Sequence, residues 1–440
     1  MRTGGRGPDV DCGGARADSA HRQGSGYWPA RSVDQFTQAY RARGHRVLVV
    51  APSYENIEPD EPGVARVPAI QRFNGSDFSV ILPIPLYLTR SINEFQPDLF
   101  HSHHPFLLGD TALRMASIHQ VPLVFTYHTM YELYTHYVPF GAVSLGEMAK
   151  RLSVGYANLC AHVIAPSRYI AGLIAARGVS TPITVIPTGV DPARYERGEG
   201  NRFRRGLGIP EKAFVVGHVG RLAPEKNLNF LAEATGMFLQ RDQSAHLVVV
   251  GAGPSQSGLM KCLDGAGVGA RAHFTGQLDE PDVIDAYHAM DVFAFSSRSE
   301  TQGIVVVEAM AAGVPVVALD APAVSEVVED GLNGLVVSRA DPREFAEALE
   351  RVAGLPPQRR DAFRQAARGT ARKYSVDVSA ERCLALYSDV LSGARCDISQ
   401  QIYEWSGFLN RVGEEWNLWA NRLSALAGVV PRTGVEQGGP

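Results

Sequence analysis

The sequence predicts an α/β protein with two doubly wound halves, each built on a parallel sheet. Three observations support this fold class. The chain has 440 residues, enough for two or three domains of about 150 residues each. Short apolar runs without polar alternation recur along it, which is typical of parallel strands covered on both faces. Helical stretches separate these runs, and the whole series starts again near Phe214.

The amino-terminal half is expected to begin at Ser32, with a helix over residues 35–43. Gly44 follows this helix, and glycine is the usual residue just past a helix end. Five apolar runs then predict the strands of the first sheet: 47–50, 99–100, 123–126, 162–165 and 184–186. A doubly wound half should also open with a strand and a glycine-rich turn before its first helix.

Residues 1–31 lack that opening pattern. They are rich in glycine and arginine and show no apolar periodicity, so we interpret them as an irregular leader. We therefore expect the first sheet to lack its first strand, and the chain as written to be impaired or inactive. Comparing its activity with that of a chain carrying a restored strand tests this hypothesis.

The carboxyl-terminal half repeats the pattern from Phe214 onward. Its strands are expected at six runs: 214–219, 247–250, 273–274, 292–295, 314–318 and 335–337. Asp341, Pro342 and Glu344 predict a helix start, with an aspartate cap and a proline in the first turn. Small-molecule chemistry is expected between the halves, at the carboxyl ends of the strands.

The expected domains are a leader at 1–31, an amino-terminal domain at 32–190, a carboxyl-terminal domain at 191–375, a helix returning to the first domain at 376–395 and an amphipathic helical extension at 396–440. In the extension, Asp397 and Gln400 form a capping-box-like start. Apolar residues then follow at alternating steps of four and three. We expect this helix, residues 397–430, to pack on the body or on a partner helix. The alternative is shallow contact with a membrane surface through its tryptophans, Trp405, Trp416 and Trp419.

Composition excludes several classes of protein. The 42 Lys and Arg against 46 Asp and Glu give a net charge of −4, so a dedicated nucleic-acid binder is not expected. Five cysteines lie far apart without a Cys-x-x-Cys pair, which predicts neither a disulfide framework nor a zinc site. No apolar run is long enough to span a membrane, and the first thirty residues lack the apolar core of a signal peptide. We expect a cytoplasmic protein, with a peripheral position on the inner membrane surface as the membrane-contact alternative.

The first candidate motif is a loop that leaves a strand and enters a helix. It runs from Gly220 and Arg221 to Lys226. Backbone N–H groups and the helix dipole at such a position favour anions. Two added cations would make a clamp for a diphosphate. The alternative is a pair of solvated surface charges beside a turn.

The second motif contains two carboxylates, Glu300 and Glu308, on either side of Gly303. Glu308 lies within an apolar run, where an unpaired carboxylate would be costly. A hydroxyl-rich ligand could satisfy it by donating hydrogen bonds, and an ion pair with a core arginine is the alternative. Gly303 permits close backbone approach, so the N–H groups of Gly303, Ile304 and Val305 could extend an anion site.

These motifs, Gly-Arg-Leu-x-x-Glu-Lys followed by Glu-x7-Glu and Ala-x-Gly-x-Pro-Val, resemble those of the retaining nucleotide-sugar glycosyltransferases of family 4, which have the GT-B fold. The likeness covers about residues 32–391. It implies that Arg221 and Lys226 bind the donor diphosphate. It also implies that Glu308 binds the ribose hydroxyls and Glu300 the hydroxyls of the transferred sugar. Family members commonly carry Gly-Gly where this chain has 320–322, Asp-Ala-Pro, so the resemblance does not fix the exact sugar contacts.

The amino-terminal half contributes histidines. His104 lies in a His-Ser-His-His run, but no carboxylate or thiolate spacing supports a metal site, so none is expected. His128 matches the cleft histidine of the family, and a buried structural histidine is the alternative. The run that follows, with Tyr131, Glu132 and Tyr137, looks like the acceptor-side segment of bacterial enzymes that glycosylate lipids such as diacylglycerol.

The resemblance therefore implies a hexosyltransferase that uses a nucleotide sugar (UDP-glucose or GDP-mannose) and a lipid or sugar acceptor, with retention of anomeric configuration. The expected catalytic residues are His128, Arg221, Lys226 and Glu300. Neither a cofactor nor a metal is expected, since the nucleotide sugar is a substrate. Two alternatives stay open: a GT-B nucleotide-sugar epimerase, and a pseudoenzyme or scaffold that lacks the first strand.

Overall fold

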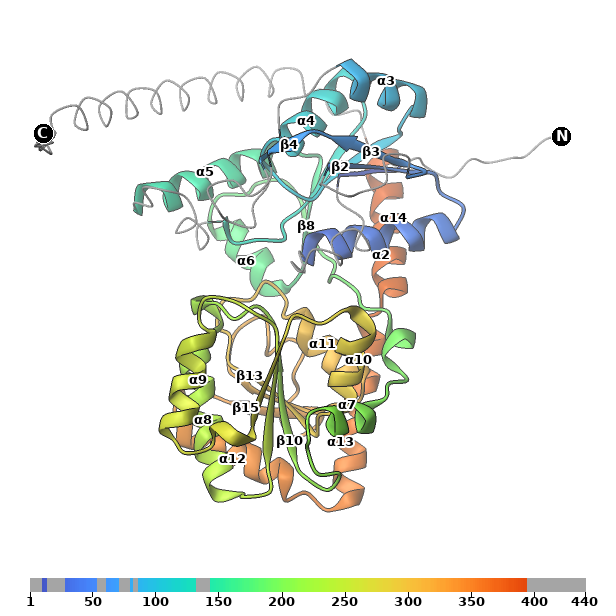
Figure 1. Cartoon of the computed structure of the whole chain (residues 1–440). Coiled ribbons are helices and arrows are strands. Elements are labelled where there is room, and N and C mark those ends of the chain that lie inside the picture. The colour runs from blue at the N-terminus through green and yellow to red at the C-terminus, as the bar shows by residue number, and fades with distance from the viewer. Residues whose placement is uncertain are drawn as a thin grey trace, which may run out of the picture.

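The computed structural model describes residues 10–13, 28–53, 61–70, 80–81, 86–131 and 143–393. Two lobes lie one above the other (Figure 1). The amino-terminal lobe holds a seven-stranded sheet in the order β3-β2-β1-β6-β7-β8-β9, with every neighbouring pair parallel. Its strands are β1 (Val10–Gly13), β2 (Val47–Pro52), β3 (Val64–Val67), β6 (Leu99–Ser102), β7 (Leu123–Thr126), β8 (His162–Ala165) and β9 (Ile183–Val185).

Helices cover both faces of this sheet, as the sequence predicts (Figure 1). They are α2 (Trp28–Ala42), α3 (Leu86–Phe95), α4 (Leu108–His119), α5 (Val143–Leu159) and α6 (Arg168–Ala176). Helix α2 ends beside Gly44, whose φ of 86° lies in the left-handed region that glycine adopts without strain. A small antiparallel pair, β4 (Ala69–Ile70) and β5 (Val80–Ile81), adjoins the lobe.

The expectation of a missing first strand is wrong. Strand β1 lies in the middle of the sheet, with Val10 opposite both Val47 of β2 and Leu99 of β6. A central parallel strand gains ladder hydrogen bonds along both edges, so four residues with Asp11 among them form it without an apolar run. The predicted leader therefore contains a structural element. This finding removes the observation that favoured a scaffold lacking the first strand.

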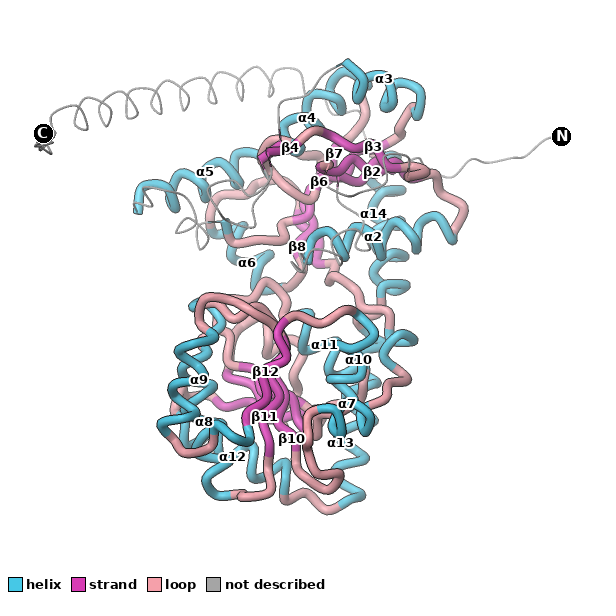
Figure 2. The backbone as a smooth tube through the Cα atoms, viewed as in Figure 1, coloured by secondary structure: helices cyan, strands magenta, loops and turns pink. Residues whose placement is uncertain are grey.

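The carboxyl-terminal lobe is built on a parallel sheet, drawn in magenta in the lower lobe of Figure 2. This six-stranded sheet has the order β12-β11-β10-β13-β14-β15. Its strands are β10 (Val215–Val219), β11 (His246–Val250), β12 (Ala272–Gly276), β13 (Val292–Phe295), β14 (Val316–Leu319) and β15 (Gly334–Val337). All six strands predicted from the sequence are confirmed, with small shifts at their ends. The predicted cap is also confirmed, because the Asp341 carboxylate accepts a hydrogen bond from the N–H of Arg343 at 2.8 Å.

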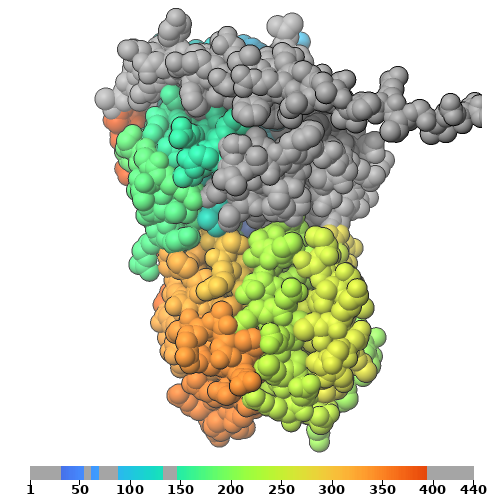
Figure 3. Space-filling model, turned by 90° about the vertical axis from the view of Figure 1, so that its left-hand side faces the viewer, coloured from blue at the N-terminus to red at the C-terminus, as the bar shows by residue number. Residues whose placement is uncertain are grey.

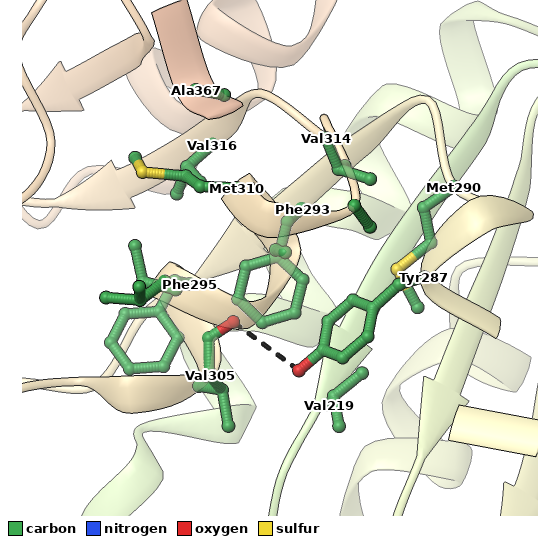
Figure 4. Close-up of a cluster of buried hydrophobic side chains, with 14 of the residues drawn as sticks. Val219, Tyr287, Met290, Phe293, Phe295, Val305, Met310, Val314, Val316 and Ala367 are labelled. Carbon is green, nitrogen blue, oxygen red and sulfur yellow. Dashed lines mark hydrogen bonds between the residues drawn. The ribbon is translucent and has the colours of Figure 1, made fainter. Parts of the chain in front are cut away.

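Helices flank the second sheet on both faces. They are α7 (Gly200–Gly206), α8 (Leu228–Arg241), α9 (Gln256–Gly265), α10 (Glu280–His288), α11 (Ile304–Ala311), α12 (Pro342–Ala353) and α13 (Pro357–Lys373). Short 3-10 turns are η3 (Pro192–Tyr195), η4 (Pro224–Lys226) and η5 (Gly269–Arg271). One apolar core lies on each face of the sheet. In the core beside α11, the Tyr287 hydroxyl of α10 lies 3.4 Å from the carbonyl oxygen of Val305 in the first turn of α11 (Figure 4).

Two crossing segments connect the lobes. The N–H of Val190 donates to the carbonyl of Tyr374, and the N–H of Val376 donates back to Val190, at 3.0 and 2.7 Å. Beyond this crossing, helix α14 (Val376–Ser392) packs against α2 of the first lobe. The hydroxyls of Tyr387 and Tyr40 meet there at 3.1 Å.

The lobes also touch directly near α6, where the two halves meet in Figure 3. The Ser167 hydroxyl donates to the carbonyl of Thr301 at 2.7 Å. The Glu326 carboxylate accepts hydrogen bonds from the first two N–H groups of α6, those of Arg168 and Tyr169. None of the described helices has the length and hydropathy needed to cross a bilayer. The predicted helix at 397–430 lies outside the described residues.

Candidate functional site

The two carboxyl-lobe motifs meet at the carboxyl ends of strands β10 and β13. The Lys226 ammonium lies 2.6 Å from a carboxylate oxygen of Glu300. Two serines after β13 hold the loops together, since Ser296 Oγ donates to the carbonyl of Lys226 and Ser299 Oγ to that of Glu225, at 3.0 and 3.2 Å. The sequence therefore correctly placed a cation and an acid at this edge of the sheet, where ligands of doubly wound sheets bind.

Two glycines after β11 support the loop that carries Arg221. A side chain at Gly251 would place its Cβ 2.0 Å from the carbonyl oxygen of Gly220, and one at Gly253 would lie 2.3 Å from that of Leu222. The N–H groups of Gly220 and Leu222 donate to the carbonyls of Val250 and Ala252, both at 3.0 Å. The backbone of the loop is thus packed against the backbone of the segment that follows β11. The Arg221 side chain is 38% exposed.

The charges at this edge are paired in the structure. The Arg221 guanidinium lies 2.5 Å from a carboxylate oxygen of Glu225. The Lys226 ammonium lies 2.6 Å from a carboxylate oxygen of Glu300. Burial opposes ionisation of Glu300, but the Lys226 ammonium and the hydrogen bonds around the carboxylate outweigh it, so the pKa of Glu300 is lowered. Glu300 is therefore an ionised hydrogen-bond acceptor at neutral pH.

The amino terminus of α11 adjoins the Glu300 loop. Gly303 has a φ of 76° and caps the helix, which begins at Ile304. The first N–H groups of a helix have no partner within it, so those near Ile304 and Val305 are available to a ligand, and the anion contact stays a prediction. Gln302 fixes the loop to the lobe crossing by exchanging hydrogen bonds with the backbone of Thr188 at 2.6 and 2.7 Å.

Glu308 is buried one helical turn further on, with 2% of its side chain exposed. Tyr195 donates to one carboxylate oxygen at 2.8 Å and Tyr287 to the other at 3.0 Å. The Arg31 guanidinium lies 3.1 Å from a carboxylate oxygen of Glu308. Burial raises the pKa of Glu308, and this effect exceeds the opposing effects of Arg31 and the two hydroxyls. The predicted alternative, an ion pair with an arginine, is thus present, and the ribose contact stays a prediction.

This arginine comes from the other lobe. Arg31 lies on α2 of the amino-terminal lobe, and its guanidinium also pairs with Glu280 at 2.8 Å and donates to the Tyr195 hydroxyl at 2.8 Å. Sequence reasoning missed Arg31, Tyr195 and Tyr287. No local signal could have found them, because the partners lie far from Glu308 along the chain and meet it only through the arrangement of the lobes.

The amino-lobe histidines form a second group, at the carboxyl ends of β6 and β7. His103 Nδ1 lies 2.8 Å from His128 Nε2, and the ring of His103 also lies 4.1 Å from that of His101. Burial lowers the pKa of His128 to about 4 and that of His101 to about 3. These histidines are neutral at pH 7. Among the described residues, no cluster of three or more His, Cys, Asp or Glu side chains is arranged to hold a metal ion.

The predicted acceptor side is described in part. The rings of His104 and Tyr131 meet edge to face at 5.4 Å, and Phe106 packs on Tyr131 at 5.2 Å. Burial lowers the pKa of His104. Glu132 and Tyr137 lie outside the described residues. The structure thus gathers the predicted residues into two groups, one on each lobe.

Comparisons with known proteins agree with this arrangement. The model of the glycosyl transferases group 1 matches residues 200–370, and that of glycosyltransferase family 4 matches residues 29–194. The chain is 31% identical over 319 residues to a D-inositol 3-phosphate glycosyltransferase of Actinosynnema mirum, covering 70% of this chain and 75% of that protein. It is 28% identical over 374 residues to an alpha-monoglucosyldiacylglycerol synthase of Acholeplasma laidlawii, covering 82% and 93%.

A solved structure shares the fold. The crystal structure of Anabaena HepE in complex with UDP and glucose matches with a TM-score of 0.68 at 21% identity, covering 87% of this chain and 99% of HepE. The two facing lobes, the parallel sheets and the paired motifs of the carboxyl-terminal lobe lead to the same conclusion as these relatives. The chain belongs to the glycosyltransferases of family 4 and has their GT-B fold.

Proposed function

We propose that this glycosyltransferase moves a hexose from a nucleotide sugar, UDP-glucose or GDP-mannose, to a lipid acceptor such as diacylglycerol. The proposal rests on one observation: the Lys226–Glu300 pair lies beside the amino terminus of α11. A nucleotide sugar needs cations and N–H groups at its diphosphate and an ionised acceptor at its sugar hydroxyls. This edge of the sheet carries both.

The reaction would depend on charge stabilisation at the leaving diphosphate. Arg221, Lys226 and the first N–H groups of α11 would face the oxygens on which negative charge develops, and the loss of one such donor commonly costs about 2.7–4 kcal/mol in the barrier. We propose that the acceptor hydroxyl attacks from the face that the diphosphate leaves and passes its proton to a leaving phosphate oxygen. This course retains the anomeric configuration and requires no metal ion.

His128 and Glu300 would hold the sugar from opposite lobes. His128 is neutral and hydrogen-bonded to His103, so its ring is fixed in orientation. The acceptor would enter beside His104 and Tyr131, with Glu132 and Tyr137 as further predicted contacts. The likeness over 93% of the length of the alpha-monoglucosyldiacylglycerol synthase supports a lipid acceptor.

Incubation with a panel of radiolabelled UDP- and GDP-sugars and diacylglycerol tests this function. We expect label from one donor to enter the lipid extract, with the same yield in the presence of EDTA. The Lys226→Ala variant should transfer label about 10²–10³ times more slowly. Label that stays on the nucleotide as a changed sugar would instead favour an epimerase, and mass spectrometry of the products distinguishes these outcomes.

An enzyme with a lipid acceptor must reach that acceptor at a membrane surface. We propose a cytoplasmic protein that reaches the inner membrane surface through residues 397–430. Liposome flotation of the full chain and of a chain ending at residue 396 tests this. The full chain should float with the liposomes and the shortened one should not.

A further inference from the structure

His218 is a buried histidine that the proposed reaction does not use. It lies on strand β10, two residues before Gly220, and 1% of its surface is exposed. Its Nδ1 lies 3.1 Å from the carbonyl oxygen of Ala294. A carbonyl oxygen only accepts, so Nδ1 carries the hydrogen and donates it. In the neutral ring, Nε2 then carries a lone pair and can only accept.

That lone pair has no hydrogen-bond donor among the residues that the structure describes. Burial lowers the pKa of His218 to about 4, so the ring is neutral at pH 7 and Nε2 does not become a donor. Buried polar atoms in folded proteins almost always have a partner. An acceptor without a protein donor at the edge of a ligand site is open to a donor that the ligand brings.

The unpartnered atom faces the candidate donor site. A Cβ built on Gly220 would lie 3.8 Å from His218 Nε2. Apart from the residues next to Gly220 in the chain, no other described residue has an atom within 4 Å of that Cβ. The charges of Lys226 and Glu300 both act on the imidazole. The cation and the acid that are proposed to hold the diphosphate and the sugar are thus close enough to His218 for their charges to influence its ring.

The chemistry of the partner follows from the lone pair. Phosphate oxygens of a nucleotide diphosphate carry no hydrogen at neutral pH, so they cannot donate to Nε2. Hydroxyl groups can donate, and the ionised Glu300 carboxylate is also an acceptor. Two acceptors at one edge fit a polyol, which can donate one hydroxyl to each.

We infer that His218 is a sugar-binding residue of the donor site, whose Nε2 accepts a hydrogen bond from a hydroxyl of the transferred hexose. This inference rests on the proposed function, because it takes the donor to be a nucleotide sugar. It goes further by assigning a specificity contact. A donor without that hydroxyl would leave Nε2 buried and unpaired, and sites built in this way discriminate strongly against such analogues.

Calorimetry with UDP, UDP-glucose, GDP and GDP-mannose tests the assignment on the full chain. His218→Phe should weaken binding of the nucleotide sugar about tenfold and leave binding of the free nucleotide unchanged, as expected for one lost hydrogen bond. His218→Gln, whose amide oxygen can accept near the position of Nε2, should restore much of the affinity. His246→Gln is the matched control, because His246 begins β11 at the opposite edge of the sheet and pairs with His273.

Deoxy donors give a second readout that does not depend on how well the variants fold. The donors are UDP-hexoses or GDP-hexoses that each lack one hydroxyl. One of them should bind wild-type protein about tenfold more weakly than the parent nucleotide sugar does. The His218→Phe variant should bind that deoxy donor and the parent equally well. An equal loss for free nucleotide and nucleotide sugar would overturn the inference, as would no loss for either or equal sensitivity of both proteins to every deoxy sugar. Wild-type protein that binds no nucleotide at all would contradict the proposed function itself and the inference with it.

Discussion

Replacing Gly251 with alanine tests whether the position of the Arg221 loop controls donor binding. Gly251 has a φ of 129°, and an added Cβ would lie 2.0 Å from the carbonyl oxygen of Gly220. That oxygen must retreat by roughly 1 Å or more before the two atoms reach ordinary van der Waals contact. Arg221 follows directly and must move with it. A displacement of about 1 Å can cost roughly 100-fold in rate, and the strained backbone should cost about 1–3 kcal/mol of stability.

The assay combines calorimetry with the nucleotide sugar, transfer kinetics and thermal unfolding. Gly251→Ala should lose about 100-fold in kcat/KM while it still unfolds cooperatively. Gly369→Ala is the matched control, since a Cβ at this position in α13 meets nothing within 4 Å among the described residues. The control should keep its donor affinity and gain about 0.5–1 kcal/mol of stability, because alanine favours helix over glycine. A Gly251→Ala enzyme with wild-type donor affinity and turnover would refute the argument that this loop places the diphosphate cation.

Three further predictions concern the charged residues. Lys226→Ala should lower the transfer rate by about 10²–10³ through the lost diphosphate contact, and a fully active variant would end that assignment. Arg31→Met should lower the free energy of unfolding by about 3 kcal/mol, because it leaves the Glu308 carboxylate buried without its cation; urea unfolding should show that Glu308→Gln in the same chain restores part of the loss. The acid dependence of stability should respond in opposite directions to two glutamine substitutions. The pKa of Glu300 is lowered, so its contribution is present above about pH 4.5 and is lost below, and Glu300→Gln should flatten the rise of stability with pH. The pKa of Glu308 is raised, so its contribution declines above about pH 4.5, and Glu308→Gln should steepen that rise; equal slopes for both variants would contradict these assignments.

Much of the fold could be predicted because its strands are buried on both faces. The runs that become β7, β8 and β13 begin and end at the predicted residues, since parallel strands between helix layers must be apolar throughout. Strand β1 was missed for a physical reason. Its four residues include Asp11, and hydrogen bonds to β2 and β6 stabilise it instead of an apolar pattern of its own.

The site could be predicted where its residues lie close together along the chain. The loop with Arg221 and Lys226 is a local pattern between a strand and a helix, and the structure has that loop as expected. The surroundings of Glu308 could not be predicted, because its arginine belongs to the other lobe and the pair depends on how the lobes meet. The unpartnered state of His218 likewise depends on three-dimensional contacts, since the sequence shows only an apolar strand with one histidine in it.

A crystal structure of the chain with UDP-glucose or GDP-mannose would locate the bound donor. Its diphosphate oxygens should lie about 3 Å from the side chains of Arg221 and Lys226 and from the first N–H groups of α11, with sugar hydroxyls on Glu300. A nucleotide bound elsewhere, or a bound sugar nucleotide that touches neither Lys226 nor Glu300, would contradict this placement of the donor.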